Sequence, residues 1–105
     1  MNRKLVVFVP PESLEPLRDA LFAAGAGRIG DYERCCWYTE GTGTFLAGDE
    51  AAPAVGETGL EQRVHELRLE TVYPAEQEAE VVAALRGAHP YEEPAFDLYP
   101  LAPHD

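Results

Sequence analysis

The segment from His89 to Pro94 holds the densest group of side chains that could do chemistry. Its six residues, HPYEEP, place an imidazole, a phenol and two carboxylates between two prolines. Such nitrogen and oxygen donors can ligate a divalent metal, and they can equally fix a turn or an interface by hydrogen bonds. We expect His89, Tyr91 and Glu92 to be ordered and bonded, and Glu93 to be solvated. His89 closely follows a predicted helix, whose dipole would favour the imidazolium cation.

Two glycine-rich segments resemble phosphate-binding sequences. Gly25–Gly30 matches G-x-G-x-x-G, but phosphate recognition requires this pattern to follow a strand and to open a helix. Here the predicted order is reversed, so we interpret the segment as a helix cap and a turn. The backbone N–H groups of Gly41 and Gly43 could hold an anion, and a hairpin turn explains the same glycines. Both glycines stay candidate binding residues.

No catalytic constellation or zinc signature is present in the sequence. The histidines, His65, His89 and His104, do not fall in H-x-H or H-E-x-x-H spacing, and Cys35 and Cys36 are adjacent rather than in C-x-x-C. Adjacent cysteines make a poor disulfide framework, which favours a reducing compartment. No feature brings two carboxylates together or removes one from water. The sequence therefore indicates a binding protein rather than an enzyme, and it identifies no cofactor.

The size and charge of the chain limit its architecture and its partners. Its 105 residues suffice for a single domain, 1–105. Nineteen acidic residues against eight Lys and Arg give a formal net charge of −11. This charge argues against nucleic acid and anionic membranes as partners, because both attract cationic surfaces. The apolar run Leu5–Pro11 is far shorter than the roughly 20 residues that span a bilayer. We expect a soluble, cytoplasmic protein.

Periodicity predicts the elements that must position these residues. The strand segments are rich in β-branched, aromatic or alternating residues, and the helical segments carry apolar residues at helical spacing. The predicted strands are Lys4–Val9, Asp31–Thr39, Val64–Tyr73 and Ala95–Tyr99, with one helix from Ser13 to a cap at Gly25 or Gly27 and a second between Pro74 and Gly87. Gly41–Gly43 is predicted to form a turn, from which Thr44–Leu46 returns as a short strand.

The order β-α-β-β-α-β predicts an α+β fold, a ferredoxin-like sandwich with two helices on one face of an antiparallel sheet. The other sheet face would stay uncovered and would carry aromatic side chains such as Trp37 and Phe45. Because open edges and apolar faces invite association, we expect another subunit to cover it. Trp37, on the hairpin Asp31–Leu46, is the predicted interface anchor. The loop Gly48–Gly59 is long enough to suggest a function or an interface.

Several motifs resemble a known family. The end of the chain, AHPYEEPAFDLYPL (Ala88–Leu101), resembles the C-terminal motif of the trimeric CutA proteins. The similarity is closer to the PII/CutA-like domain inserted in YqfO-type proteins, a family often labelled GTP cyclohydrolase type 1 type 2 homologue. The other matching segments are AGAGRIGDY (Ala24–Tyr32), TEGTGTF (Thr39–Phe45), VGETG (Val55–Gly59), ELRLE (Glu66–Glu70) and HPYEEPAFD (His89–Asp97).

This resemblance implies a free-standing PII/CutA-like domain that assembles as a homotrimer. YqfO-type proteins carry their dinuclear metal site in flanking halves outside this domain, so their hydrolase label is not carried over. The favoured function is a non-enzymatic, homo-oligomeric binding or regulatory module for a small ligand or a divalent cation of unknown identity. One alternative is a CutA-like divalent-metal-binding protein with His89, Glu92 and Glu93 as donors. The other is a metal-dependent hydrolase of the parent family.

Overall fold

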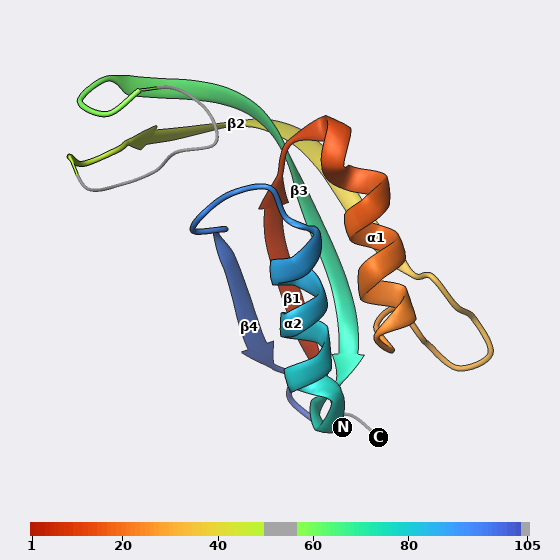
Figure 1. Cartoon of the computed structure of the whole chain (residues 1–105). Helices are drawn as coiled ribbons and strands as arrows, with labels where there is room; N and C mark the ends of the chain where they lie inside the picture. The colour runs from red at the N-terminus through yellow and green to blue at the C-terminus, as the bar shows by residue number, and fades with distance from the viewer. Residues whose placement is uncertain (50–56, 104–105) are drawn as a thin grey trace.

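Four strands form one antiparallel sheet in the computed structural model, which describes residues 1–49 and 57–103 (Figure 1). The strands are β1 (Asn2–Val9), β2 (Cys36–Leu46), β3 (Glu61–Pro74) and β4 (Phe96–Pro100), in the spatial order β2-β3-β1-β4. Helices α1 (Leu14–Ala23) and α2 (Glu78–Ala88) lie on the same face of this sheet. The predicted α+β, ferredoxin-like βαββαβ sandwich is therefore confirmed.

The apolar core lies between the sheet and the two helices. Strand β1 occupies an interior position, and its alternate residues Leu5, Val7 and Val9 are fully buried against the helices. Complete burial of one such aliphatic side chain contributes about 1.5–3 kcal/mol. The buried residues of the core are Leu5, Val7, Val9, Leu14, Leu17, Leu21, Ala26, Leu67, Leu69, Tyr73, Val81 and Leu85. None of the helices in the described part of the chain is long and apolar enough to cross a membrane.

The helix ends agree only partly with the sequence prediction. Ser13 stands at the N-cap of α1, and Gly25 ends that region with a φ of 111°, which glycine adopts without the strain of a Cβ. Helix α2 does not end at Gly87, as predicted, but continues to Ala88. It ends because His89 precedes Pro90, and a residue before proline is displaced from the helical region. His89 accordingly has extended backbone angles, φ −82° and ψ 135°.

Strand β2 runs without a turn through Gly41–Gly43, so the predicted hairpin Asp31–Leu46 is wrong. The strand starts at Cys36 and pairs with β3 along its whole length, from Cys36 opposite Thr71 to Leu46 opposite Glu61. Neither Gly41 nor Gly43 has a positive φ. Gly43 instead allows a close approach, because a Cβ there would overlap the carboxylate of Glu66 on β3.

Beyond the end of β1, the strands β2 and β3 continue as a two-stranded arm (Figure 1). Strand β1 ends at Val9, which pairs with Leu67, so the arm consists of Gly41–Leu46 and Glu61–Glu66. Residues 50–56, which include most of the predicted loop Gly48–Gly59, lie outside the described residues. At the opposite end of the sheet Arg3 pairs with Pro100, so the first and last strands have their outer ends side by side.

A polar cluster fastens β1, β3 and α2 together at that opposite end. The hydroxyl of Tyr73, a residue only 1% exposed, donates a hydrogen bond to Glu78 Oε1 at 2.6 Å. The same hydroxyl accepts one from Arg3 Nε at 3.2 Å, and Arg3 is 2.9 Å from Glu78 Oε1. Burial, together with the bond to Glu78, raises the pKa of the Tyr73 phenol. The hydroxyl therefore stays a donor at neutral pH.

The variant Tyr73→Phe removes this hydroxyl while it keeps the buried ring. We expect the free energy of unfolding in urea to fall by about 1–2 kcal/mol, because Arg3 and Glu78 lose a buried partner but still contact each other. Tyr99→Phe is the matched control, since Tyr99 is 46% exposed on β4, and it should change stability by less than about 0.5 kcal/mol. Equal effects of the two substitutions would contradict the structural role of the cluster.

Candidate functional site

His89 is buried at the end of α2 and is bonded through both ring nitrogens. The residue as a whole is only 6% exposed to solvent. Nε2 lies 2.6 Å from the carbonyl oxygen of Phe8 on β1, and Nδ1 lies 3.2 Å from the backbone N–H of Tyr91. A carbonyl oxygen can only accept and a backbone N–H can only donate. The imidazole is therefore neutral, with its proton on Nε2.

The predicted preference of His89 for the cationic form is wrong. Burial lowers the pKa of the imidazole, and this effect exceeds the opposite effects of the bond to Phe8 and of the Glu66 charge. The helix dipole acts near the C-terminal turn, but a buried ring loses the hydration that a cation requires. The helix alone would favour the cation, but strand β1, which is distant in sequence, contacts the ring through the Phe8 carbonyl.

Tyr91 connects the loop after α2 to strand β3. Its ring packs on the imidazole of His89, with the ring centroids 4.9 Å apart and a 57° angle between the planes. Its hydroxyl faces the carboxylate of Glu66, which acts on it electrostatically. Burial, followed by Glu66 and then Glu12, raises the pKa of the Tyr91 phenol far above its ordinary value. The Tyr91 phenol therefore stays protonated beside the Glu66 carboxylate.

Glu66, from the ELRLE segment, joins this loop to the base of the arm, although the sequence did not predict it as a site residue. The register pairs Glu66 with Gly41, so both lie on the sheet face that the helices leave uncovered. The carboxylate extends over Gly43 on the neighbouring strand and lies next to the Tyr91 hydroxyl. Alternation along β3 places Glu66 on the face opposite to Leu67 and Leu69, and the pairing of β2 with β3 brings it to Gly43. We name this set of contacts, from Phe8 through His89, Tyr91 and Glu66 to Gly43, the loop–arm network.

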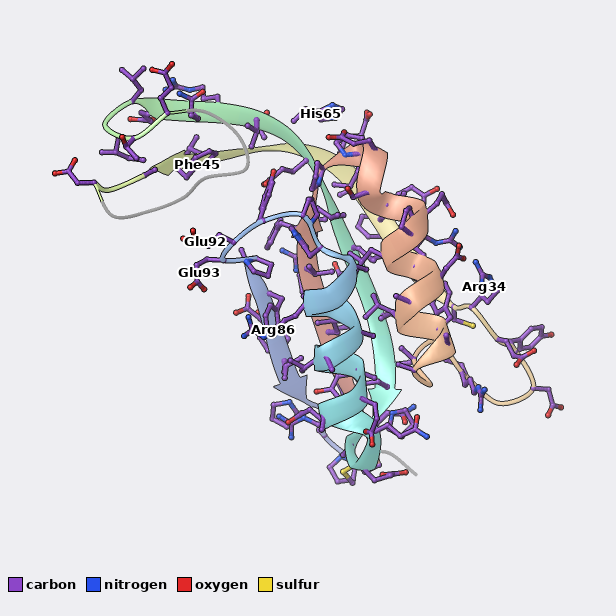
Figure 2. The ribbon with its side chains drawn as sticks, viewed as in Figure 1. Arg34, Phe45, His65, Arg86, Glu92 and Glu93 are labelled. Carbon is purple, nitrogen blue, oxygen red and sulfur yellow. The ribbon has the colours of Figure 1, made fainter. Side chains whose placement is uncertain are left out.

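The two acids of the predicted site lie apart from this network. Glu92 and Glu93 are exposed, and both project outward from the loop (Figure 2). His89 has no lone pair left for a metal, because its ring nitrogens bond Phe8 and Tyr91. Within residues 1–49 and 57–103, no group of three or more His, Cys, Asp or Glu side chains is arranged to hold a metal ion. The geometry therefore argues against His89, Glu92 and Glu93 as a joint donor set.

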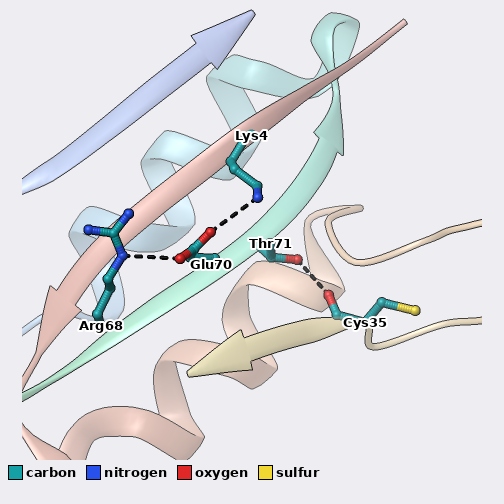
Figure 3. Close-up of polar contacts among 5 residues, drawn as sticks. All are labelled: Lys4, Cys35, Arg68, Glu70 and Thr71. Carbon is teal, nitrogen blue, oxygen red and sulfur yellow. Dashed lines mark hydrogen bonds and ion pairs between the residues drawn. The ribbon is translucent and has the colours of Figure 1, made fainter. Parts of the chain in front are cut away.

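The uncovered sheet face carries an ion-paired cluster next to Trp37. Glu70 Oε1 lies 3.1 Å from Lys4 Nζ, and Glu70 Oε2 lies 3.1 Å from Arg68 Nε (Figure 3). The bond from Lys4, followed by that from Arg68, lowers the pKa of the Glu70 carboxyl. Thr71 Oγ1 donates to the Cys35 carbonyl at 2.7 Å and ties the start of β2 to β3.

Beside this cluster lies a shallow hollow of about 480 Å³, and the side chain of Trp37 forms part of its lining. Trp37 is 60% exposed in the single chain. The hollow is lined by Lys4, Ile29, Cys35, Cys36, Trp37, Glu70, Thr71 and Val72. Lys4 and Glu70, the charged side chains of the hollow, are paired with each other. The surface that remains available to another molecule is therefore mainly apolar.

The substitution Gly43→Ala tests the loop–arm network. An added Cβ would overlap the Glu66 carboxylate and would displace it from Tyr91, so we expect a loss of up to about 1 kcal/mol in the free energy of unfolding, because the flexible Glu66 side chain can move away. Gly41→Ala is the matched control, because no atom lies within 4 Å of a Cβ at Gly41. That variant should be as stable as the unsubstituted chain or slightly more stable, since alanine lowers the conformational entropy of the unfolded chain. The free energy of unfolding of both variants is measured in urea. A Gly43→Ala protein as stable as Gly41→Ala would contradict the contact between Gly43 and Glu66.

Known proteins match almost the whole chain. The chain is 57% identical over 100 residues to a protein of Mycobacterium tuberculosis named GTP cyclohydrolase 1 type 2 homolog, a match that covers 95% of this chain and 26% of that protein. A Bacillus subtilis protein of the same name is 50% identical over 99 residues. The chain thus spans about a quarter of the length of the curated relatives that it matches. No family model matches the sequence.

Solved structures also match almost the whole chain. A Bacillus cereus protein related to NIF3 is 47% identical with a TM-score of 0.80, and the match covers 95% of this chain and 25% of that one. The periplasmic divalent cation tolerance protein CutA from Archaeoglobus fulgidus has a TM-score of 0.71 at 17% identity, over 99% of this chain and 87% of that one. GlnK of B. subtilis has a TM-score of 0.60 at 15% identity, over 93% and 82%. The chain therefore has the PII/CutA-like fold and corresponds to one segment of the GTP cyclohydrolase 1 type 2 homologues, as its motifs predicted.

Proposed function

We propose that this chain is a non-enzymatic, homo-oligomeric binding or regulatory module, whose subunits associate through the arm and the uncovered sheet face. The observation that carries this proposal is the outer edge of β2. This strand of 11 residues lies at the end of the order β2-β3-β1-β4 and pairs with β3 on one side. A long open edge offers N–H and C=O groups that favour pairing with another chain.

Exposed apolar side chains along β2 and the arm support the same association surface. They lie on the strand itself, at the arm and beside the hollow, and they would be covered by a second copy. These residues are Ile29, Trp37, Tyr38, Leu46 and Leu60, each at least 47% exposed. The resemblance to the trimeric CutA proteins favours three copies in the assembly. Residues 1–105 would then form one cytoplasmic domain in each subunit.

The chemistry of the titratable groups supports a binding rather than a catalytic role. Among the described residues, each group with a shifted pKa is bonded to another group of the same chain. These residues are Arg18, Glu70, Tyr73, His89 and Tyr91. A general acid or base has to face its substrate, whereas these side chains fasten the fold. The relatives' name is carried by proteins about four times as long, so we do not extend it to this segment.

Light scattering on the purified chain tests the assembly. We expect a mass near three times the 11.5 kDa of one chain at micromolar concentration. A monomer under these conditions would overturn the proposed assembly. Turnover of a nucleotide that a chelator abolishes would overturn the non-enzymatic part.

The variant Trp37→Ala tests the contact surface itself. If a neighbouring subunit buries this side chain, its truncation lowers the stability of the assembly by a few kcal/mol, since buried tryptophans dominate interface energetics. Tyr32→Ala is the control, because Tyr32 is 75% exposed and lies outside β2. Mass and melting temperature are measured for both variants over a dilution series. A Trp37→Ala protein with the mass and melting temperature of the unsubstituted chain would exclude Trp37 as the anchor.

A further inference from the structure

Two neighbouring side chains hold the loop Pro90–Pro94 against the sheet. His89 donates through Nε2 to the Phe8 carbonyl on β1, and the Tyr91 hydroxyl faces Glu66 on β3. Between them, the backbone N–H of Tyr91 donates to His89 Nδ1 at 3.2 Å. The start of the loop therefore depends on an imidazole nitrogen that has to stay unprotonated.

Protonation of the imidazole is incompatible with this arrangement. A proton on Nδ1 would point at the N–H of Tyr91, so two donors would face each other without an acceptor. The ring is also buried, so the cation could not recover the lost bond from water while it stays in place. The protonated ring has to separate from Tyr91, and the loop has to open for it to do so.

The groups around His89 do not compensate this conflict. On β3, Glu66 is the charge that favours the cation, but burial has the larger effect and lowers the pKa of His89. Tyr91 faces the ring as a neutral phenol, and Glu12, in the short helix η1 (Pro11–Ser13), acts on Tyr91. On α2, the guanidinium of Arg86 lies over the ring of Phe96 at 5.2 Å. The contact from β1 is an uncharged carbonyl.

We propose that His89 is an acid-released latch for the loop Pro90–Pro94. The neutral imidazole holds the loop closed on β1 and β3. When the imidazole takes up a proton, the Tyr91 N–H loses its acceptor and the Tyr91 side chain withdraws from Glu66 at the base of the arm. The latch thus changes the surface next to the arm in response to pH. It uses contacts within one chain, so it stands independently of the proposed oligomer.

The direction of the pH effect follows from proton linkage. The pKa of His89 in the closed loop lies below its ordinary value of 6.5, so the open loop binds more protons than the closed one. The closed state is fully favoured above about pH 6.5. Below that pH, and down to the lowered pKa, the equilibrium moves toward the open loop by up to about tenfold for each pH unit.

Amide hydrogen exchange between pH 7.5 and 4.5 tests the latch, with each rate corrected for its intrinsic pH dependence. The protection factor of the Tyr91 amide should fall by up to about tenfold per unit below pH 6.5, while that of Leu69 in the central strand β3 stays unchanged. In His89→Gln, which keeps a donor for Phe8 but does not titrate, Tyr91 protection should not vary with pH. His65→Gln replaces an exposed histidine that lies 3.4 Å from Glu40, and it should retain the original pH dependence.

Three results would overturn the latch. The first is a Tyr91 protection factor that does not change with pH in the unsubstituted chain. The second is a fall that persists in His89→Gln, and the third is an equal fall at Leu69, which would indicate global unfolding. If His89→Gln does not fold, NMR titration of His89 in the unsubstituted chain decides. A midpoint below 6.5 with the proton on Nε2 at neutral pH supports the latch, and a midpoint at or above 6.5 overturns it.

Discussion

The register of β3 is the constraint on which the rest of the structure depends. This strand of 14 residues pairs with β1 from Leu67 to Pro74 and with β2 from Glu61 to Thr71. In this register Leu67 and Leu69 enter the core, while Glu66 and Glu70 face the uncovered side. A shift by one residue would reverse every side chain, so the apolar requirement of the core also fixes the positions of these acids.

The two outward acids of β3 are satisfied in different ways. Glu70 is bonded by two cations, Lys4 and Arg68, in a chain that has only eight Lys and Arg against nineteen acids. Glu66 lies next to the neutral phenol of Tyr91, whose ring packs on the imidazole of His89. The first arrangement stiffens the centre of the sheet. The second places an uncharged phenol between the arm and His89, and burial lowers the pKa of that imidazole.

Local pattern predicted the sandwich, because strand alternation and helical stripes record which residues face the core. It failed where the backbone role or the charge state of a residue depends on a partner that is distant in sequence. Gly43 was assigned to a turn by the conformational freedom of glycine, but it makes room for Glu66 on another strand. His89 was assigned a charge from its own helix, but Phe8, 81 residues away, helps to fix its tautomer. No spacing rule within one segment contains such information.

The pairing of Arg3 with Pro100 has a mechanical consequence. Among the pairs that join β1 to β4, a force that pulls the two ends of the chain apart reaches this pair first and then Lys4 with Tyr99. The hydrogen bonds between β1 and β4 would thus be loaded one after another, as when a zipper opens, and they resist tension less well than bonds sheared together. The arm lies at the far end of the sheet, so it would carry this tension last.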